Sequence, residues 1–139
     1  AQDAGLRRLL VQRAAHGLPS VLTPHPLEAA RLLGTSTSKV QADRLASAQA
    51  LATLTQSCVV LKGAGSVIAR AQGLPHINPT GNARLSIAGS GDVLAGMMGA
   101  RMAQGQTAWE AACGAVYAHG QRAEEGPQDS VLTADMLAC

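Results

Sequence analysis

The segment Gly89-Ser90-Gly91-Asp92 carries residue types that bind phosphate groups. It follows an apolar stretch and precedes a helical pattern, so we expect it at the N-terminus of a helix. Helix N-termini offer unpaired amides and partial positive charge, and the two glycines let an anion approach the backbone closely. Asp92 is also typical of an N-cap or first-turn carboxylate that only stabilises its helix. The Rossmann and Walker A patterns are excluded, because the third glycine and the required lysine spacing are missing.

A second glycine-rich segment, Lys62-Gly63-Ala64-Gly65-Ser66, follows an apolar run of strand length. Open α/β sheets collect ligands beyond the carboxyl ends of their strands, so this cation with its glycines predicts a nucleotide contact. The alternative is a tight hairpin turn in which glycines supply positive φ. The residues of the segment leave both interpretations open.

His25 stands between Pro24 and Pro26, which hold it in an extended turn after a short apolar segment. This rigidity is typical of a binding residue, and a histidine that satisfies a nearby backbone group is the alternative. The other histidines show no spacing that indicates a metal, and we interpret them as structural or exposed: His16, His76 and His119.

The elements that must position these residues alternate between helices and strands in the first half of the chain. The periodicity predicts an amphipathic helix over 4–16, a strand over 20–23, a helix over 28–33 closed by Gly34, a helix over 39–56 after N-caps at Ser36 to Ser38, and a strand over 58–61 buried on both faces. The second half predicts a returning hairpin strand over 66–70, a short strand over 75–78, and helices over 92–104, 107–124 and 133–138. This order predicts one α/β domain with strands first and helices last.

Length and composition exclude several function classes. A chain of 139 residues, 47% hydrophobic and 14% charged, fits one folded domain and excludes a multidomain assembly or general disorder. A net charge of +2 without a basic run, with one Trp, one Tyr and no Phe, argues against a nucleic-acid partner. No apolar stretch approaches the about 20 residues that cross a bilayer, and no secretory signal pattern is present. We therefore expect no membrane partner and a cytoplasmic location.

The three cysteines are odd in number and lack metal-ligand spacing. We therefore interpret Cys58, Cys113 and Cys139 as reduced residues, mainly of the core.

Four blocks in fixed order, from residue 20 to about 137, resemble one known family. They are Val21 to Gly34, Val59 to Ser66, Asn78 to Asn82 and Ala88 to Gly96, and they closely resemble the ADP/ATP-dependent NAD(P)H-hydrate dehydratases. The resemblance implies an α/β fold, the three-layer ribokinase-like fold, of which this chain matches only the C-terminal portion. It also implies nicotinamide nucleotide repair: dehydration of the S epimer of NADHX or NADPHX to NADH or NADPH. The phosphoryl donor would be ADP in preference to ATP, with Mg²⁺ as cofactor.

The same resemblance implies roles for individual residues. Those expected to bind the adenine nucleotide are Lys62, Gly63, Ala64, Gly65, Ser66 and Gly91. His25 and Asp92 would bind the hydrate, and Asp92 would also be the catalytic base for the ring hydroxyl. Gly89, Ser90 and Gly91 would form the phosphate cradle. Glu28 is the carboxylate nearest a Mg²⁺ role, because Pro24-His25-x-x-Glu28 resembles an Asn-x-x-Glu motif of ribokinase-like kinases.

The chain departs from the family pattern at two places. Leu27 stands where the family usually has glycine, in the turn of His25, and Ala83-Arg84 replaces a usual Pro-Gly after Asn82. Arg84 has the size and charge to crowd or recharge the approach to the phosphate cradle.

Two other functions remain open at this point. One is a ribokinase-like kinase that stops at the phosphate ester of a sugar or vitamin precursor. The other is a truncated, non-catalytic fragment. Because the family's catalytic domain is longer, we expect the isolated chain to be inactive, and to form a homo-oligomer or to depend on a missing N-terminal segment that completes the sheet.

Overall fold

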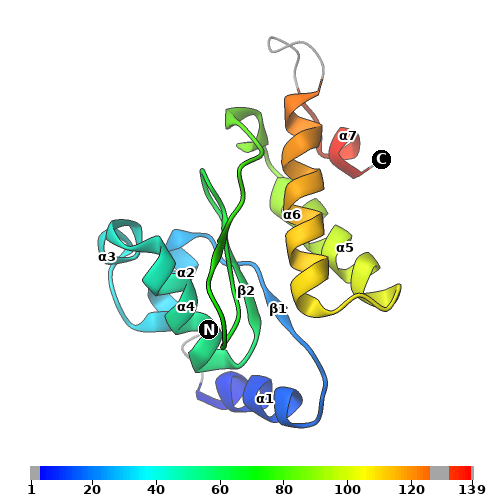
Figure 1. Ribbon diagram of the computed structural model, residues 1–139. Helices are drawn as coiled ribbons and strands as arrows, with labels where there is room; N and C mark the ends of the chain where they lie inside the picture. The colour runs from blue at the N-terminus through cyan, green and yellow to red at the C-terminus, as the bar shows by residue number, and fades with distance from the viewer. Residues whose placement is uncertain (1–3, 126–131, 139) are drawn as a thin grey trace. The chain divides into compact units, whose positions relative to one another are not determined.

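The computed structural model describes residues 4–125 and 132–138 (Figure 1). The chain divides into two compact units, one ending at Ile77 and one beginning at Asn78. The single partial domain that we expected for residues 1–139 stays a prediction.

The first unit contains a four-stranded mixed sheet in the order β1-β2-β3-β4. Its strands are β1 (Val21–Leu22), β2 (Cys58–Leu61), β3 (Val67–Ala69) and β4 (His76–Ile77). The first pair is parallel, with Val21 opposite Cys58, and the other two pairs are antiparallel. All four residues of β2 are buried, as its uninterrupted apolar run predicts. The expected strands and the hairpin are therefore confirmed.

Four helices accompany this sheet: α1 (Ala4–Ala15), α2 (Pro26–Leu33), α3 (Thr37–Ala42) and α4 (Arg44–Thr55). Helices α2, α3 and α4 gather on one side of the strands (Figure 1). Their apolar residues pack with those of the sheet into one core, which includes Ala30, Val40, Leu51, Val59 and Leu61. Gly34 ends α2 in the left-handed conformation, with φ of 66°, as the sequence predicts.

The prediction of one helix over 39–56 is wrong, because the segment forms two helices that meet at Asp43. The backbone of Asp43 leaves the helical region, with φ of −144° and ψ of 86°. Its side chain accepts a hydrogen bond from the amide of Ala46 at 2.9 Å, which caps α4. Aspartate favours such local bonds over a continuous helix. Ser36 caps α3 by accepting from the amide of Lys39, so the cap expected in this region is confirmed.

Helix α1 confirms the expected element, but its apolar side is not buried among the described residues. The side chains of Leu6 and Leu9 are 52% and 56% exposed, and Val11 is also exposed. An amphipathic helix ordinarily turns such residues toward a core.

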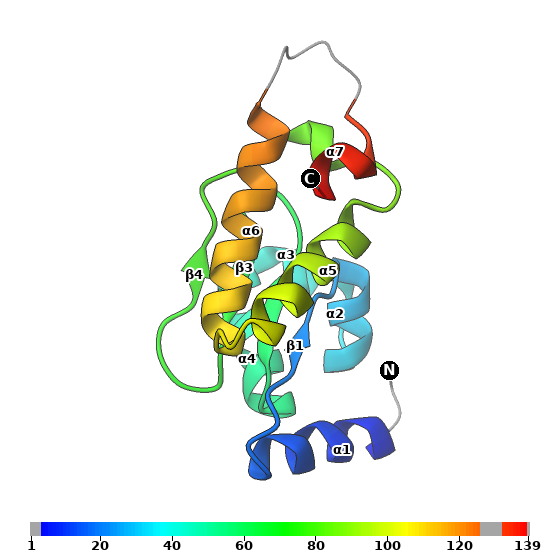
Figure 2. The same ribbon diagram turned by 90° about the vertical axis from the view of Figure 1, so that its right-hand side faces the viewer.

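The second unit is helical. It contains a short 3₁₀ helix, η1 (Ala83–Leu85), followed by α5 (Ser90–Ala103), α6 (Ala108–Glu124) and α7 (Ala134–Ala138). Helix α5 packs along α6, and α7 packs against both (Figure 2). A small core joins Ala123 of α6 to Leu132 and Leu137, with Ile87 and Val93 packed around it. The three predicted helices are confirmed, although α5 begins two residues earlier than expected.

Cys58 is buried and Cys113 half-buried, and neither forms a disulfide within the described part of the chain. This confirms the reduced interpretation for both, whereas Cys139 lies outside the described residues. Among the helices that the structure describes, none is long and apolar enough to cross a membrane. The cytoplasmic location stays a prediction.

Candidate functional site

A glycine precedes α5 in place of a capping side chain. Gly89 has φ of 83° and makes no side-chain hydrogen bond. Its carbonyl oxygen accepts from the amides of Asp92 and Val93, each at 3.0 Å. The amide of Gly91 donates to no group in the residues that the structure describes. An unpaired amide at a helix N-terminus is the donor that an anion-binding loop requires.

Asp92 lies in the first turn of α5, and its side chain is exposed. Of the two structural alternatives, the first-turn carboxylate is the one observed, because the N-cap is Gly89. Within residues 4–125 and 132–138, no hydrogen bond or ion pair engages the Asp92 carboxylate. The carboxylate is therefore accessible to a ligand, and its catalytic role stays a prediction.

His119 of α6 contacts the first residue of α5. Its side chain is 5% exposed, and Nε2 lies 3.1 Å from the carbonyl oxygen of Ser90 and 3.3 Å from Ser90 Oγ. Burial lowers the pKa of His119, and the hydrogen bond with the Ser90 backbone partly offsets that effect. From the sequence, His119 is predicted only to be structural or exposed. The contact joins positions 29 residues apart, and no local spacing signals it.

The loop Asn78-Pro79-Thr80-Gly81-Asn82 is docked on the second half of α6. Thr80 Oγ1 donates to the carbonyl of Tyr117 at 2.9 Å, and the Gly81 amide donates to Glu124 Oε1 at 2.7 Å. Asn82 Nδ2 donates to the carbonyl of Ala123 at 3.1 Å. The turn residues of this block therefore fix η1 and the start of α5 relative to α6.

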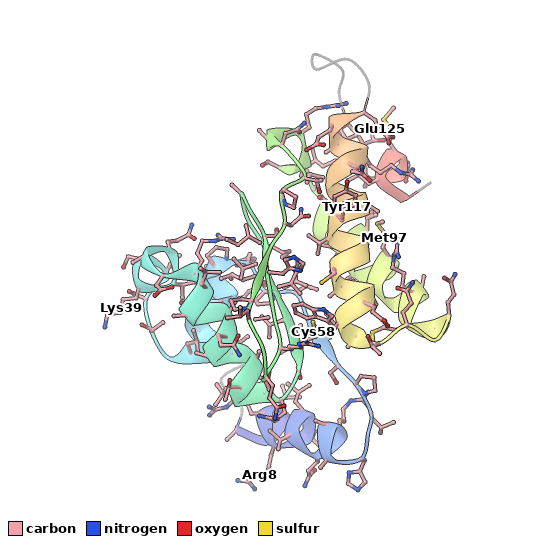
Figure 3. All side chains as sticks on the ribbon, in the orientation of Figure 1. Arg8, Lys39, Cys58, Met97, Tyr117 and Glu125 are labelled. Carbon is pink, nitrogen blue, oxygen red and sulfur yellow. The ribbon has the colours of Figure 1, made fainter. Side chains whose placement is uncertain are left out.

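Arg84 is occupied at the end of α6. Its Nη1 donates to the carbonyls of Ala123 and Glu125, at 2.8 and 2.9 Å, and Glu125 is labelled at the end of that helix in Figure 3. A cation at a helix C-terminus satisfies carbonyls that have no partner within the helix. These bonds hold Nη1 at the end of α6, and the expectation that Arg84 crowds or recharges the phosphate cradle stays a prediction.

In the first unit, the segment from Lys62 to Ser66 forms the loop between β2 and β3. Gly63 and Gly65 adopt φ of 148° and 61°, a region that favours glycine. Ser66 Oγ donates to the Gly63 carbonyl at 3.0 Å and lies 3.3 Å from the Gly63 amide. The five-residue loop is longer than the two-residue turn of a tight hairpin. Its glycines are required by the backbone, and a nucleotide role is compatible with that requirement.

Arg44, at the first position of α4, donates hydrogen bonds to the backbone carbonyls of this loop. Its Nη2 donates to the carbonyl of Leu61 at 3.1 Å and lies 3.4 and 3.5 Å from the carbonyls of Lys62 and Gly65. A Cβ added at Gly63 would meet the guanidinium, with Nη2 at 2.9 Å. Partial burial lowers the pKa of Arg44, and an arginine remains charged at neutral pH. No motif indicated Arg44, because the carbonyls to which it donates lie 17 to 21 residues away.

His25 caps α2 in a reciprocal arrangement with Glu28. His25 Nδ1 accepts from the Glu28 amide at 3.3 Å, and Glu28 Oε2 accepts from the His25 amide at 2.7 Å. Glu28 Oε1 lies 3.4 Å from His25 Nε2. This is a capping box, the local role that we kept as the alternative for His25. Leu27 lies within the first turn of α2 and is exposed, so this turn does not require the family's glycine.

The His25 turn and the Lys62 loop lie side by side in the first unit. Strands β1 and β2 are parallel, and the amide of Lys62 donates to the carbonyl of Pro24 at 2.9 Å. The carboxyl ends of both strands therefore bring together two of the segments that the sequence singled out. Residues 89–92 belong to the second unit.

The described residues contain no group of three or more histidine, cysteine, aspartate or glutamate side chains arranged to hold a metal ion. Both carboxylate oxygens of Glu28 face His25, so this side chain serves the helix cap.

These features define a class of protein: an α/β chain whose strand-end loops and helix N-terminus suit phosphate-bearing ligands. The family model described as NAD(P)H-hydrate dehydratase matches residues 3–139. The chain belongs to the NAD(P)H-hydrate dehydratase family.

Relatives in other organisms agree with this assignment. The ADP-dependent (S)-NAD(P)H-hydrate dehydratase of Neisseria meningitidis is 44% identical over 118 residues, which cover 85% of this chain and 40% of that protein. The ADP/ATP-dependent NAD(P)H-hydrate dehydratase of Bacillus subtilis, co-crystallised with ATP and Mg²⁺, is 36% identical with a TM-score of 0.78. The match covers 86% of this chain and 44% of that one.

A ribokinase-like superfamily protein of Enterococcus faecalis is 26% identical with a TM-score of 0.74, over 94% of this chain and 47% of that one. The predicted α/β, ribokinase-like fold is therefore confirmed. The chain spans less than half the length of these relatives.

Proposed function

We propose that this chain supplies nucleotide and hydrate sites of an ADP/ATP-dependent (S)-NAD(P)H-hydrate dehydratase, which restores NADH or NADPH. Family membership supports the proposal. The observation that carries it is the N-terminus of α5, where the unpaired Gly91 amide and the exposed Asp92 carboxylate are adjacent. One residue can hold a phosphoryl oxygen while the next accepts a proton.

The family resemblance also assigns ligand roles to residues of the first unit. Lys62, with Gly63 to Ser66, is assigned to the adenine nucleotide, and His25 to the hydrate. The Lys62 amide is tied to the Pro24 carbonyl, so the two segments are placed side by side. We propose ADP as the preferred donor, in keeping with the name of the Neisseria meningitidis relative.

In the first chemical step, the ring hydroxyl of the hydrate attacks the terminal phosphorus of the nucleotide. The oxygen–phosphorus bond forms as the bond to the bridging oxygen breaks, and AMP leaves when the donor is ADP. Asp92 accepts the hydroxyl proton, while the Gly91 amide stabilises negative charge on the phosphoryl oxygens. A carboxylate is a weak base for an alcohol, so proton transfer is late and positioning supplies most of the rate enhancement.

In the second step, the phosphate ester eliminates. The carbon–oxygen bond breaks, phosphate leaves with the electron pair, and the neighbouring ring carbon loses a proton to solvent to form the double bond. The ring nitrogen donates electron density toward the departing phosphate, so the protein needs to add little. The products are phosphate, AMP and the restored dihydronicotinamide.

The described carboxylates do not form a Mg²⁺ site of their own, since Glu28 serves the α2 cap and no cluster of three ligands is present among them. Mg²⁺ commonly binds through nucleotide phosphates with few protein ligands. We propose that it enters with the nucleotide.

A hybrid protein tests the function. The 139 residues replace the matching segment of the Neisseria meningitidis relative, and the hybrid is incubated with (S)-NADHX, ADP and Mg²⁺. We expect NADH absorbance to return in proportion to AMP formed. A folded hybrid that consumes ADP without forming NADH, and accumulates a phosphate ester, would instead support the kinase alternative. A folded hybrid that neither binds nor consumes nucleotide would support the non-catalytic alternative.

A further inference from the structure

The contact between His119 and Ser90 has a defined direction. A carbonyl oxygen only accepts hydrogen bonds, so the 3.1 Å approach of Nε2 to the Ser90 carbonyl requires that Nε2 carry a proton. Ser90 Oγ, 3.3 Å from the same nitrogen, is then a second acceptor. The hydroxyl keeps its own proton for another partner. The ring donates from the interior of the second unit, since both residues are buried.

The Ser90 carbonyl and the Gly91 amide belong to the same peptide plane. In a trans peptide the C=O and N–H bonds point in opposite directions, and the described chain has no cis peptide. A carbonyl turned toward His119 therefore turns the Gly91 N–H away from His119. This is the amide that has no partner within the described residues.

We propose that His119 is a positioning residue that orients the Gly91 amide toward a phosphoryl oxygen of the nucleotide. The ligand assignment rests on the proposed function, whereas the orientation of the peptide rests on the hydrogen bond itself. Glycine on both sides of Ser90 makes this first turn of α5 easier to deform than an ordinary helix turn, so a donor from outside the helix adds restraint to its hydrogen bonds. Helix α6 supplies that donor across its packing contact with α5.

Three variants of the 139-residue chain separate this role from ordinary packing. His119→Gln keeps an N–H donor at a similar distance from the backbone, whereas His119→Leu keeps volume and removes the donor. Val116→Ala is the matched control, because Val116 is a buried residue of the same helix whose side chain has no hydrogen-bonding group to lose. The measurements are ADP affinity by calorimetry and the Gly91 amide resonance in ¹H–¹⁵N spectra, without and with ADP.

We expect His119→Leu to weaken ADP binding by about tenfold, the effect of losing one buried hydrogen bond. His119→Gln should stay within about threefold of the original chain, and Val116→Ala should lower the melting temperature without changing ADP affinity. In ligand-free spectra, the Gly91 resonance should move in His119→Leu and stay in place in His119→Gln.

Unchanged ADP affinity in a folded His119→Leu chain would overturn the proposal, as would an equal loss in Val116→Ala. Should His119→Leu not fold, His119→Asn replaces it, because its shorter amide does not reach Ser90. If the original chain binds no ADP, the affinity measurements are made in the hybrid protein, and a folded hybrid that binds no ADP means that the proposed function fails at its nucleotide site. The ligand-free spectra then decide the positioning role alone, and an unmoved Gly91 resonance in the leucine or asparagine variant would overturn it.

Discussion

Asp92 is the residue on which the proposed chemistry depends most directly. We predict that Asp92→Asn in the hybrid protein lowers turnover by about 10²- to 10⁴-fold, because an amide does not accept the hydroxyl proton. The fold should change little, since the Asp92 side chain makes no capping bond. NADH formation and the thermal melt of the variant are the measurements. Near-original dehydration by the variant would eliminate Asp92 as the base.

A substitution at Gly65 tests the nucleotide role of the Lys62 loop, because Gly65 lies in that loop with φ of 61°. We predict that Gly65→Val weakens ADP binding more than hydrate binding, since a β-branched side chain resists positive φ and fills space that phosphates need. Gly17→Val is the control: Gly17 has φ of 70° at the end of α1, with no atom within 4 Å of an added Cβ. Both affinities are measured by calorimetry. Equal loss of both in Gly65→Val would argue against a nucleotide role for the loop.

His119 also predicts how stability depends on pH. Burial depresses its pKa in the folded chain below the ordinary value of about 6.5, so the unfolded chain binds more protons as the pH falls through that value. The free energy of unfolding should therefore be highest above about pH 6.5 and fall as the pH drops toward the lowered pKa. His119→Gln, which does not titrate, should lose less stability over the same range in urea unfolding. An identical pH dependence in both chains would contradict the prediction.

At the residue scale, the sequence indicates the glycines and Asp92 but not the side chains that hold them in place. Residue type and spacing within a few positions identify a helix N-terminus and a positive-φ turn. His119 and Arg44 act on Ser90 and on the Lys62 loop from positions distant in the chain, so no local pattern contains them. For His25, the motif did indicate a distinct turn, and the structure adds its capping bond with Glu28.

At the scale of the elements, the hydrogen bonds from Arg44 of α4 to the Lys62 loop lead to a prediction. Arg44→Met removes the donors that face the carbonyls of Leu61, Lys62 and Gly65, so ADP affinity should fall about threefold to tenfold. Arg44→Lys should not restore it, because an ammonium lacks the planar fork that reaches several carbonyls. The readout is calorimetric titration with ADP.

Lys39→Met is the matched control for Arg44→Met. Lys39 lies on α3, exposed and pointing away from the sheet (Figure 3), so its substitution makes the same change in charge without touching the loop. Similar losses of ADP affinity in the two variants would show that net charge governs nucleotide binding and that the Arg44 hydrogen bonds do not.

Element identity was largely predictable, whereas one boundary was not. The apolar run of β2 and the glycine after α2 determine their elements locally, and both predictions hold. The helix break at Asp43 was not predicted, because the apolar periodicity continues on both sides of it. A single side-chain bond to Ala46 outweighs that periodicity and starts a new helix.

At the scale of the whole molecule, uncovered apolar surface predicts self-association of the isolated chain. Leu6 and Leu9 of α1 are more than half exposed, and β1 pairs only with β2 among the described strands. Exposed apolar patches and free strand edges favour contact with another chain. We predict concentration-dependent dimers or larger species in light scattering, and reduced association when Leu6 and Leu9 are both replaced by glutamate.

Gln12→Glu, on the same helix and exposed, controls for added negative charge. It should leave association nearly unchanged. A monodisperse monomer of the original chain at every concentration, with a cooperative melt, would refute the prediction. Dehydratase activity of the purified chain alone would also refute the expectation that it needs further structure.

The docking of residues 80–84 on α6 limits how this family member can change in length during evolution. The helix offers carbonyls and a carboxylate at Tyr117, Ala123 and Glu124, and Gly120 lies against Thr80. Inserting or deleting one residue between these positions would rotate every later one by about 100° around the helix axis, away from its partner. Insertions and deletions should therefore accumulate before residue 117 or after Glu125, and the segment between them should keep a constant length.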